Sequence, residues 1–301
     1  MGREMLYESA EELRRFDARP CRRRARPRGV LVCPPDHFDV TEVRNVHMEG
    51  MLGTVDHDAA RAEWEALVRG MEALGLEVAR LEPAPDLADM VFTCNPSLGG
   101  VDREGRPFAI LSRMRHPGRA REVERHRRWL RARGVRIVEI PAEAEGVWEG
   151  GGDAIWHPGR YFLWGGHGQR SDRQPYAALS RTLELPVALL RLDDPEFYHL
   201  DTCLAMLDER SAAWVPAAFT EEGRGLIAVG FERLIEVDET EARERFAANL
   251  YSPDGARVLL PAGAPKTRAR LERAGFEVHE LATDEYLKSG GSIYCMRQEI
   301  F

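Results

Sequence analysis

The sequence predicts an α/β fold in one domain, assembled from modules in which a helix, a glycine and a strand follow one another. Three segments have this order: residues 58–81, 119–140 and 266–281. A recurring unit of this kind is typical of folds in which each module packs a helix against a sheet. Hydrophobic residues make up 44% and charged residues 31% of the 301 residues. This is the balance of a globular domain, and no low-complexity linker divides the chain.

The first predicted strand is Gly29–Cys33, a run of apolar residues that ends at a pair of prolines. Residues 58–74 then carry apolar side chains at helical spacing. Gly75 ends this helix, and residues 76–81 alternate in polarity as a half-buried strand does.

The two other copies of the module have the same parts, with helices at 119–133 and 266–274 and strands at 135–140 and 276–281. A second group of strands is predicted from short apolar runs. These runs are 91–93, 154–156, 161–164, 212–215 and 257–260.

Glycine-rich phosphate loops of the G-x-G-x-x-G or G-x-x-x-x-G-K-[ST] kind follow none of the predicted strands. The triplet Gly150–Gly152 lies between a tryptophan and a strand, so we do not expect it to open a helix. The sequence therefore gives no support for a nucleotide cofactor, and we expect the protein to need none.

The N-terminal segment carries a basic cluster, Arg22–Arg28. The whole chain has a net charge of -8, which opposes binding to a phosphate backbone. We therefore interpret residues 1–28 as a solvated lead-in to the domain at 29–301, in preference to a nucleic-acid-binding arm. The segment lacks the apolar run of a secretion signal, and the chain has no stretch of roughly 20 apolar residues that could span a membrane.

The five cysteines are widely spaced, and no pair has the C-x-x-C spacing of a zinc or redox site. We expect no disulfide framework and no metal site, and a reducing cytoplasm as the location. A few buried thiols and one reactive thiol would account for this pattern.

Two segments carry residues suited to proton transfer and nucleophilic attack. His199 and Asp201 would point to the same face of a strand, where the carboxylate could orient the imidazole. A structural histidine beside an acid is the commoner arrangement. Cys295 ends a predicted short strand after Gly290 and Gly291. From this segment alone, a buried structural thiol is slightly favoured over a nucleophile.

Two further segments present polar groups next to strands. Glu149 and Asp153 flank the three glycines, an arrangement suited to a cationic ligand, although a solvated glycine turn is the alternative. Asn95 ends an apolar strand and is followed by Pro96, which restricts its backbone. Together the four segments supply a thiol, a His–Asp pair, two acids and an amide.

The order of these motifs resembles the guanidine-modifying superfamily, which includes arginine deiminases, dimethylarginine dimethylaminohydrolases, arginine dihydrolases and amidinotransferases. The matching motifs are Phe-Thr-x-Asn-Pro, Glu-Gly-x-Gly-Asp, Phe-x-His-x-Asp and a C-terminal Ser-Gly-Gly-Ser-x-x-Cys. The segment Cys33–Val40, with Asn45 and Met48–Gly50 behind it, is similar to the hydrolase branch. The resemblance extends from about residue 30 to the end of the chain, and arginine dihydrolase-like hydrolases are its nearest match.

The resemblance implies a five-bladed α/β propeller (pentein) of ββαβ modules with the active site at the central axis. By motif match, Cys295 would be the nucleophile, His199 the general acid/base and Glu149 the second catalytic carboxylate. The substrate-binding residues would be Asp201, Asn95, Asp153, Asn45 and Phe38.

Three departures from the family pattern matter. Asn95 stands where many members have an aspartate, which removes one charge from the guanidinium site. The usual Glu-Gly-Gly-Asp is one residue longer, so Glu149 and Asp153 compete for one role. Around Asn45 the sequence is Arg-Asn-Val-His, where close hydrolase relatives tend to have Asn-Pro-Trp.

These features predict a hydrolase that cleaves the guanidinium C–N bond of arginine or a related guanidine through a covalent cysteine intermediate. One alternative is an amidinotransferase that passes the amidino group to an amine. The short tail after Cys295 and the Cys33–Val40 segment favour hydrolysis. A second alternative is an inactive arginine-binding protein. The expected partner is a small guanidine, without nucleic acid or membrane, and a homo-oligomer is compatible with the sequence.

Overall fold

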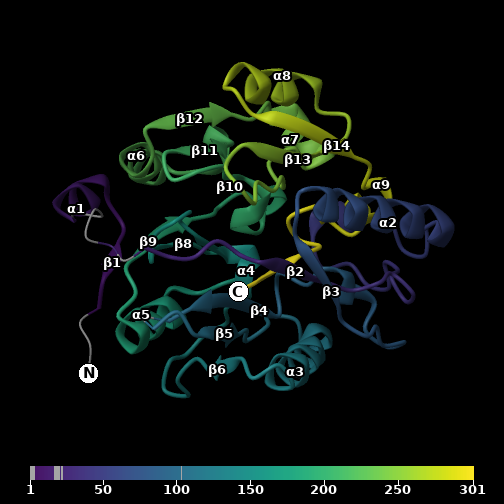
Figure 1. Ribbon diagram of the computed structural model, residues 1–301, viewed down its shortest axis with the longest axis horizontal. Coiled ribbons are helices and arrows are strands. Elements are labelled where there is room, and N and C mark those ends of the chain that lie inside the picture. Colours follow the sequence, from purple (N-terminus) through teal and green to yellow (C-terminus); the bar gives the residue numbers. More distant parts are fainter. Residues whose placement is uncertain (1–3, 17–20, 22, 103) are drawn as a thin grey trace.

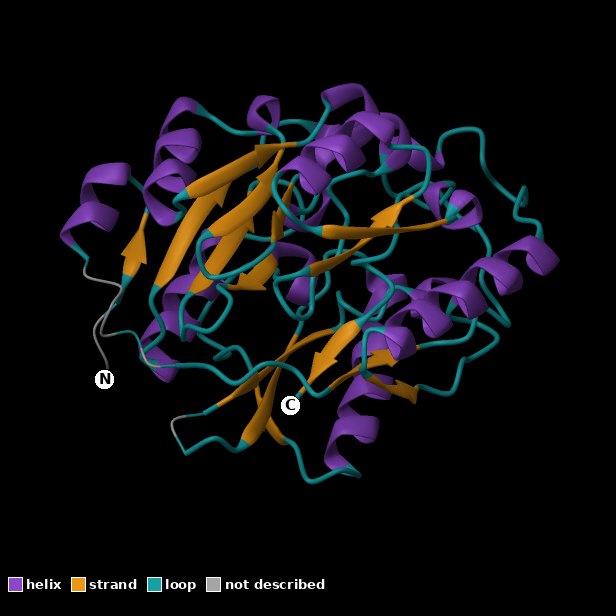
Figure 2. Ribbon diagram, turned by 45° about the horizontal axis from the view of Figure 1, so that its top comes forward, coloured by secondary structure: helices purple, strands orange, loops and turns teal. Residues whose placement is uncertain are grey.

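The computed structural model describes residues 4–16, 21, 23–102 and 104–301. Strands form an inner layer and most helices lie outside them (Figure 2). The strands are β1 (Leu6–Tyr7), β2 (Gly29–Val32), β3 (Glu77–Arg80), β4 (Ser97–Val101), β5 (Pro107–Leu111), β6 (Arg136–Val138), β7 (Ala154–Trp156), β8 (Leu163–His167), β9 (Val187–Arg191), β10 (Leu204–Met206), β11 (Ser211–Trp214), β12 (Arg233–Glu236), β13 (Arg257–Pro261), β14 (Glu277–Leu281) and β15 (Gln298–Ile300).

The α-helices connect these strands or cap the sheets, and α4 lies near the middle of the molecule in Figure 1. They are α1 (Ala10–Arg15), α2 (His57–Ala73), α3 (Pro117–Arg131), α4 (Gly150–Asp153), α5 (Arg173–Leu183), α6 (Glu221–Gly230), α7 (Glu239–Arg245), α8 (Pro265–Arg273) and α9 (Asp284–Leu287).

The described strands form five separate sheets, and none of them closes on itself. Their strand orders are β1-β9-β8-β7, β10-β11-β12, β13-β14, β15-β2-β3 and β4-β5-β6. Each sheet contains one parallel pair whose two strands are connected through a helix: α2, α3, α5, α6 or α8. The recurring helix–strand unit predicted from the sequence is thus confirmed, and it occurs five times in the described chain.

In four of these sheets a further strand pairs antiparallel with the first strand of the parallel pair. In three of them this strand precedes the pair in the chain. In the fourth it is β15, which comes from the C-terminal end and pairs with β2 near the other end. Gln298 lies opposite Leu31, and Ile300 lies opposite Gly29. The C-terminal segment therefore completes the first module, and Cys295 lies three residues before this strand.

The predicted helices at 58–74, 119–133 and 266–274 correspond to α2, α3 and α8. Four of the five strands in the second group also form, as β7, β8, β11 and β13. The strand expected at 91–93 is wrong: Ala88–Val91 is a 3-10 helix, and the chain then turns. Short apolar runs do not distinguish a strand from a buried turn by their periodicity.

Three predictions about the local backbone of the site are also wrong. His199 and Asp201 do not lie on a strand, because His199 is the N-cap of the 3-10 helix Leu200–Thr202. Cys295 lies in a turn between α9 and β15. The glycine triplet does form a helix, since Gly150–Asp153 is a single turn of α4 that leads directly into β7. In each case a turn, and not an extended strand, carries the functional side chain.

The N-terminal segment packs onto the sheets more closely than a solvated lead-in would. β1 adds a parallel edge strand to β9, and α1 packs against α6. Arg24 is only 8% exposed and lies over the rings of Trp156 and Phe301. Arg22, at the start of the basic cluster, lies outside the described residues.

Helices with enough length and apolar character to cross a membrane do not occur among the residues that the structure describes.

Candidate active site

Cys295 is 3% exposed and is held by a buried asparagine, Asn249. The Asn249 side-chain oxygen accepts hydrogen bonds from the backbone N–H groups of Tyr294 (3.0 Å) and Cys295 (3.2 Å). Its amide nitrogen donates to the Cys295 Sγ at 3.2 Å and to the carbonyl oxygen of Asp201 at 3.0 Å. A single side chain thus fixes both the turn that carries the thiol and the thiol itself.

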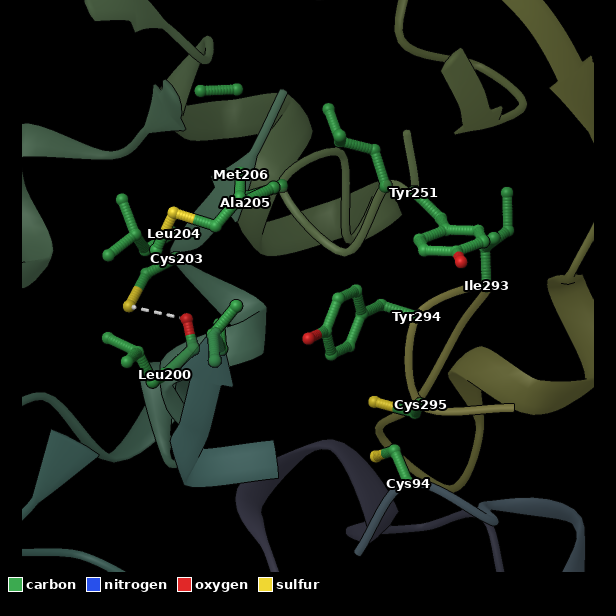
Figure 3. Packing of buried hydrophobic residues seen from close by; sticks show 14 of the residues in the cluster. Cys94, Leu200, Cys203, Leu204, Ala205, Met206, Tyr251, Ile293, Tyr294 and Cys295 are labelled. Atoms are coloured by element: carbon green, nitrogen blue, oxygen red, sulfur yellow. Dashed lines mark hydrogen bonds between the residues drawn. The ribbon is translucent and has the colours of Figure 1, made fainter. Parts of the chain in front are cut away.

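Asp201 and a second cysteine, Cys94, lie beside Cys295. The Cys295 Sγ is 3.1 Å from Asp201 Oδ2, and the Cys94 Sγ is 3.6 Å from the same oxygen. Figure 3 shows the two sulfur atoms next to each other, whereas Cys203 points away toward the Leu200 carbonyl. The other carboxyl oxygen of Asp201, Oδ1, is buried and has no hydrogen-bond partner. A buried acceptor without a donor is unusual, so this oxygen retains the capacity to accept a hydrogen bond.

The environment of Cys295 favours its thiolate. Burial alone raises the pKa of this thiol, but hydrogen bonds from Cys94, Asp201 and the Ser292 backbone, with the charge of His199, lower the pKa to about 6. Burial and the adjacent Cys295 sulfur raise the pKa of Asp201 well above its ordinary value. The proton shared by these two groups is therefore best placed on Asp201, whose protonated carboxyl can donate to the thiolate.

His199 is the second catalytic candidate, and a carboxylate orients it. Its Nε2 lies 2.8 Å from Glu149 Oε2, and both side chains are buried. Glu149 also accepts a hydrogen bond from the Arg115 backbone N–H at 2.9 Å and one from Arg170 at 3.4 Å. Since Nε2 is directed at Glu149, the other ring nitrogen of His199 is free to exchange a proton with a ligand.

Glu149 remains ionised although it is fully buried. Burial raises the pKa of this carboxyl, but the hydrogen bond and charge of His199, followed by the charges of Arg170 and Arg119, hold the pKa below its ordinary value. A buried carboxylate with these cationic partners is well suited to fix the orientation of an imidazole.

Asp153 connects α4 to the His199–Asp201 segment through hydrogen bonds. Its Oδ1 accepts from the Leu200 backbone N–H at 3.1 Å, and its Oδ2 accepts from the Ser171 hydroxyl at 2.7 Å. Burial raises the pKa of Asp153 to about 6, even though the charge of His199 and the Ser171 hydrogen bond lower it. The geometry thus separates the two competing acids, because Glu149 contacts His199 and Asp153 holds the backbone beside it.

The three glycines between these acids allow α4 to lie directly against the site. A Cβ on Gly150 would overlap the Asn95 carbonyl, and Gly150 also has a φ of +46°. A Cβ on Gly152 would overlap the Asn95 side chain and lie 3.2 Å from the His199 ring. The glycine triplet is therefore explained by close packing at the site, without a phosphate ligand.

Four of the eight predicted residues line one small cavity, and Glu149, Asp153 and Asp201 are not part of its lining. Cys295, His199, Asn95 and Asn45 line it, whereas Phe38 lies behind it, stacked on Tyr286 with ring centroids 4.9 Å apart. Asn95 accepts from Arg119 at 3.2 Å, and its side-chain nitrogen is buried without a partner. Asn45 donates to the Ser289 carbonyl at 3.2 Å and accepts from the His47 N–H at 3.0 Å.

Several residues at the site were not identified from the sequence. Three arginines with side chains less than 10% exposed line the cavity, and Asp89 lies among them; they are Arg44, Arg119 and Arg170. Asp89 forms an ion pair with Arg44 and lies 3.6 Å from Arg119. Asn249 was also missed. Its signal is a single amide within the apolar run 246–251, where a buried polar group needs partners.

Among the described residues, one group has side-chain atoms placed closely enough to hold a metal ion. These are Cys94, Asp201 and Cys295, with ligand atoms within 4.8 Å of one another. Three protein ligands with an open fourth position are compatible with zinc. Metal binding would, however, occupy the thiol that faces the cavity.

A thiol of lowered pKa, an imidazole oriented by a buried carboxylate and an unpartnered acceptor define a cysteine-dependent hydrolase site. A family model described as N,N dimethylarginine dimethylhydrolase, eukaryotic, matches residues 40–301, and the chain belongs to this family. The protein is therefore an enzyme of the class that hydrolyses C–N bonds in guanidino compounds.

Two curated relatives cover most of this chain. The N(G),N(G)-dimethylarginine dimethylaminohydrolase of Mycobacterium tuberculosis is 36% identical over 281 residues, which are 93% of this chain and 88% of that protein. The bifunctional arginine dihydrolase/ornithine cyclodeaminase ArgZ of Synechocystis is 32% identical over 269 residues, which are 89% of this chain and 37% of ArgZ. The chain therefore spans little more than a third of the bifunctional protein.

Solved structures of the ArgZ N-terminal domain share this fold. A cysteine-to-serine mutant of that cyanobacterial arginine dihydrolase, bound to substrate, matches with a TM-score of 0.84 and 31% identity. The match covers 90% of this chain and 97% of that domain. The same domain has been solved covalently bound to a reaction intermediate, with a TM-score of 0.83.

Proposed function

We propose that this protein hydrolyses the guanidinium group of arginine or of a methylated arginine through a covalent intermediate on Cys295. The observation that carries this proposal is the unpartnered Oδ1 of Asp201, in a carboxyl group whose other oxygen is 3.1 Å from the Cys295 sulfur. A guanidinium ion brings planar N–H donors and an electrophilic carbon to the same place.

In the first step, the Cys295 thiolate attacks the guanidinium carbon. Binding of the cation displaces the proton of Asp201 to solvent, because the cation favours the ionised carboxylate, which can then accept a guanidinium N–H at Oδ1. Asn95 is neutral, so it contributes no second negative charge. The free ring nitrogen of His199 donates a proton to the departing amine, the C–N bond breaks, and the carbon remains bound to Cys295 as a thiouronium.

In the second step, the departing amine leaves room for water. His199 removes a proton from this water, which attacks the thiouronium carbon, and the C–S bond breaks to restore the thiolate. Glu149 is a positioning residue in both steps, because it contacts the imidazole and not the substrate. The covalently trapped intermediate in the related ArgZ domain supports this two-step course.

The cavity is suited to the amino-acid end of such a substrate. Arg44, Arg119 and Arg170 line it, and each guanidinium can form paired hydrogen bonds with a carboxylate. We assign the substrate α-carboxylate to this group and the α-amino group to Asp89. We also propose that the five sheets are the blades of a propeller, with the cavity at its centre.

The direct test is incubation of the purified protein with arginine, monomethylarginine, dimethylarginine and agmatine, with products identified by mass spectrometry. Deiminase activity on arginine gives citrulline and ammonia, dihydrolase activity gives ornithine, ammonia and carbon dioxide, and dimethylaminohydrolase activity on dimethylarginine gives citrulline and dimethylamine. The Cys295→Ser variant should lose more than about 10³-fold in kcat. Cys203→Ser is the matched control, because this buried thiol donates to the Leu200 carbonyl, outside the cavity.

Full activity of Cys295→Ser would overturn the covalent mechanism. Products that form only when an amine acceptor is added would replace hydrolysis by amidino transfer. Glu149→Gln should lower kcat with a smaller effect on KM, since it disturbs the orientation of His199 and leaves the substrate contacts in place.

A further inference from the structure

Cys94 makes or breaks no bond in the proposed reaction, although it lies beside the nucleophile and its hydrogen bond helps to lower the pKa of Cys295. Its sulfur is fully buried and shares the Asp201 Oδ2 acceptor with Cys295. The two residues also contact through the backbone, because the Cys94 N–H donates to the Cys295 carbonyl at 3.2 Å. They are 201 positions apart in the sequence, so this contact depends on the fold.

The two thiols are placed so that they can be joined. A backbone hydrogen bond of 3.2 Å limits the separation of the two Cα atoms to about 7 Å, near the upper limit for a disulfide. The sulfurs lie within 4.8 Å of each other, and a disulfide requires about 2 Å. Rotation of the two side chains about their Cα–Cβ bonds can supply a difference of about 3 Å.

We infer that Cys94 and Cys295 form an intramolecular disulfide when the enzyme meets a peroxide, and that this bond reversibly blocks the active site. The Cys295 thiolate attacks one peroxide oxygen, the O–O bond breaks, and hydroxide leaves, so that Cys295 becomes a sulfenic acid. The Cys94 thiol then attacks the Cys295 sulfur, the S–O bond breaks, and water leaves with the proton of Cys94. Both cysteines are oxidised and the peroxide is reduced.

The environments of the two thiols indicate which of them reacts first with peroxide. Cys295 lines the cavity and has a lowered pKa, so it presents a thiolate to a small oxidant. Burial and then Cys295 raise the pKa of Cys94, which keeps Cys94 protonated beside the thiolate. Once Cys295 is a neutral sulfenic acid, the part of this shift that comes from the Cys295 thiolate is removed, and only the effects of burial and Asp201 still favour the protonated form of Cys94. Cys94 is therefore the resolving residue.

The disulfide would protect the nucleophile as well as block it. Without a neighbouring thiol, a sulfenic acid on Cys295 would be exposed to a second peroxide molecule, which oxidises it irreversibly to sulfinic acid. A reductant would restore both thiols from the disulfide. Recovery of activity after peroxide treatment therefore depends on Cys94. This holds whether the substrate is arginine or another guanidine.

The experiment treats the full chain with hydrogen peroxide and compares wild type with Cys94→Ala, Cys94→Ser and the control Cys203→Ala. Cys203 is equally buried, but its sulfur donates to backbone carbonyls and not to the Asp201 carboxyl. Peptide mapping without reduction should find residue 94 linked to residue 295, and the number of free thiols should fall by two. Activity of each variant is expressed relative to its own untreated, reduced sample.

Wild type and Cys203→Ala should regain about 90% of their activity with dithiothreitol. Both Cys94 variants should stay inactive after prolonged peroxide and carry sulfinic or sulfonic acid on Cys295. The inference is overturned if no linked peptide forms in wild type, or if the Cys94 variants recover as fully as wild type. The peptide map needs no substrate. It therefore tests the disulfide even if the protein does not have the proposed activity.

Discussion

At the scale of single residues, Asn249 controls the chemistry of the thiol through one hydrogen bond. Its amide nitrogen donates to the Cys295 sulfur, and a donor of this kind stabilises the thiolate more than the thiol. This hydrogen bond acts beside those from Cys94, Asp201 and the Ser292 backbone, which lower the pKa of Cys295 to about 6. We infer that Asn249 favours the thiolate without touching the substrate in the proposed mechanism.

We predict that iodoacetamide alkylation of Cys295 rises with pH around a midpoint near 6, the pKa of the thiol. Asn249→Ala should move this midpoint upward by about one to two pH units, because a hydrogen bond to a charged group contributes about 1.5–3 kcal/mol. The pH profile of alkylation at Cys295, followed by peptide mass spectrometry, checks this. Asn45→Ala is the control, because it lines the cavity without contacting the thiol; an equal shift in both variants contradicts the assignment.

Asp153 connects its own ionisation to the stability of the fold. Its pKa of about 6 in the folded protein lies above the ordinary value of 3.8, so the folded state binds the proton more tightly than the unfolded state. The resulting stabilisation is complete below pH 3.8 and is lost as the pH rises through 6. A shift of about two units corresponds to about 3 kcal/mol.

Asp153→Asn should remove this dependence, because the amide stays neutral and its oxygen can still accept from the Leu200 N–H. The free energy of unfolding of wild type, relative to that of the variant, should therefore decrease by up to about 3 kcal/mol between pH 4 and pH 7. Urea unfolding at several pH values measures this difference. A constant difference across the range would show that Asp153 does not titrate in this way.

The residue types of the site could be predicted from the sequence better than its contacts. The motifs led to Cys295, His199, Asn95 and Asn45, which line one cavity. The arginines around them gave no motif, since 42 lysines and arginines are spread over the chain and most arginines lie on surfaces. Which of them turn inward is decided by buried partners such as Asp89 and Glu149, and these contacts join distant segments.

At the scale of elements, the long helices and alternating strands were predictable, and the turns that carry the site were not. Helix α2 has a periodic apolar face over 17 residues, and this pattern identifies a helix even when its ends are misplaced by a residue or two. The turn of α4 has four residues, and three of them are glycine. The low helix propensity of glycine opposes a helix at this position, but close packing of the turn on residues 94–95 requires glycines there.

Gly152→Ala should therefore damage the site far more than the fold. A Cβ at this position overlaps the Asn95 side chain and crowds the His199 ring. We expect kcat/KM to fall at least 100-fold, because small displacements of catalytic groups have effects of this size. The control Gly225→Ala, in the middle of α6, meets only one atom, 3.5 Å away, and should leave activity unchanged and raise stability by about 0.5–1 kcal/mol.

Activity assays and thermal melts of both variants distinguish a local from a global effect. If Gly152→Ala keeps full activity, α4 has room to move, and the close contact with His199 is not needed. Loss of folding in Gly152→Ala alone would instead assign the glycine to stability.

At the scale of the whole molecule, the last strand of the described chain, β15, joins the sheet of β2 and β3, two of its first three strands. β15 has only three residues and lacks a readable pattern, so its pairing with β2, more than 260 residues earlier, could not be predicted. Gln298 adds hydrogen bonds to Ser97 at 2.8 Å and His126 at 3.0 Å, and these join the first module to its neighbour. The C-terminal segment thus holds both a sheet and the turn of Cys295.

Removal of residues 298–301 should accordingly weaken the whole structure and the active site together. The deletion removes the β15 ladder, the buried Gln298 contacts and the Phe301 ring under Arg24. Burial of one aromatic ring and two buried hydrogen bonds together amount to at least about 3 kcal/mol. We expect a lower melting temperature, and slower alkylation of Cys295 at pH 7 because its turn loses the strand that follows.

The matched control removes residues 1–8, which include β1. That strand pairs with β9 at the edge of another sheet and contributes two residues. Thermal melting and Cys295 alkylation of the two truncated proteins test the argument. Each deletion removes one edge strand. If both deletions lower stability equally and leave the reactivity of Cys295 unchanged, β15 acts only as an edge strand and does not support the turn of Cys295. A selective loss of thiol reactivity in the C-terminal deletion is expected, since only β15 directly follows the turn that Asn249 holds.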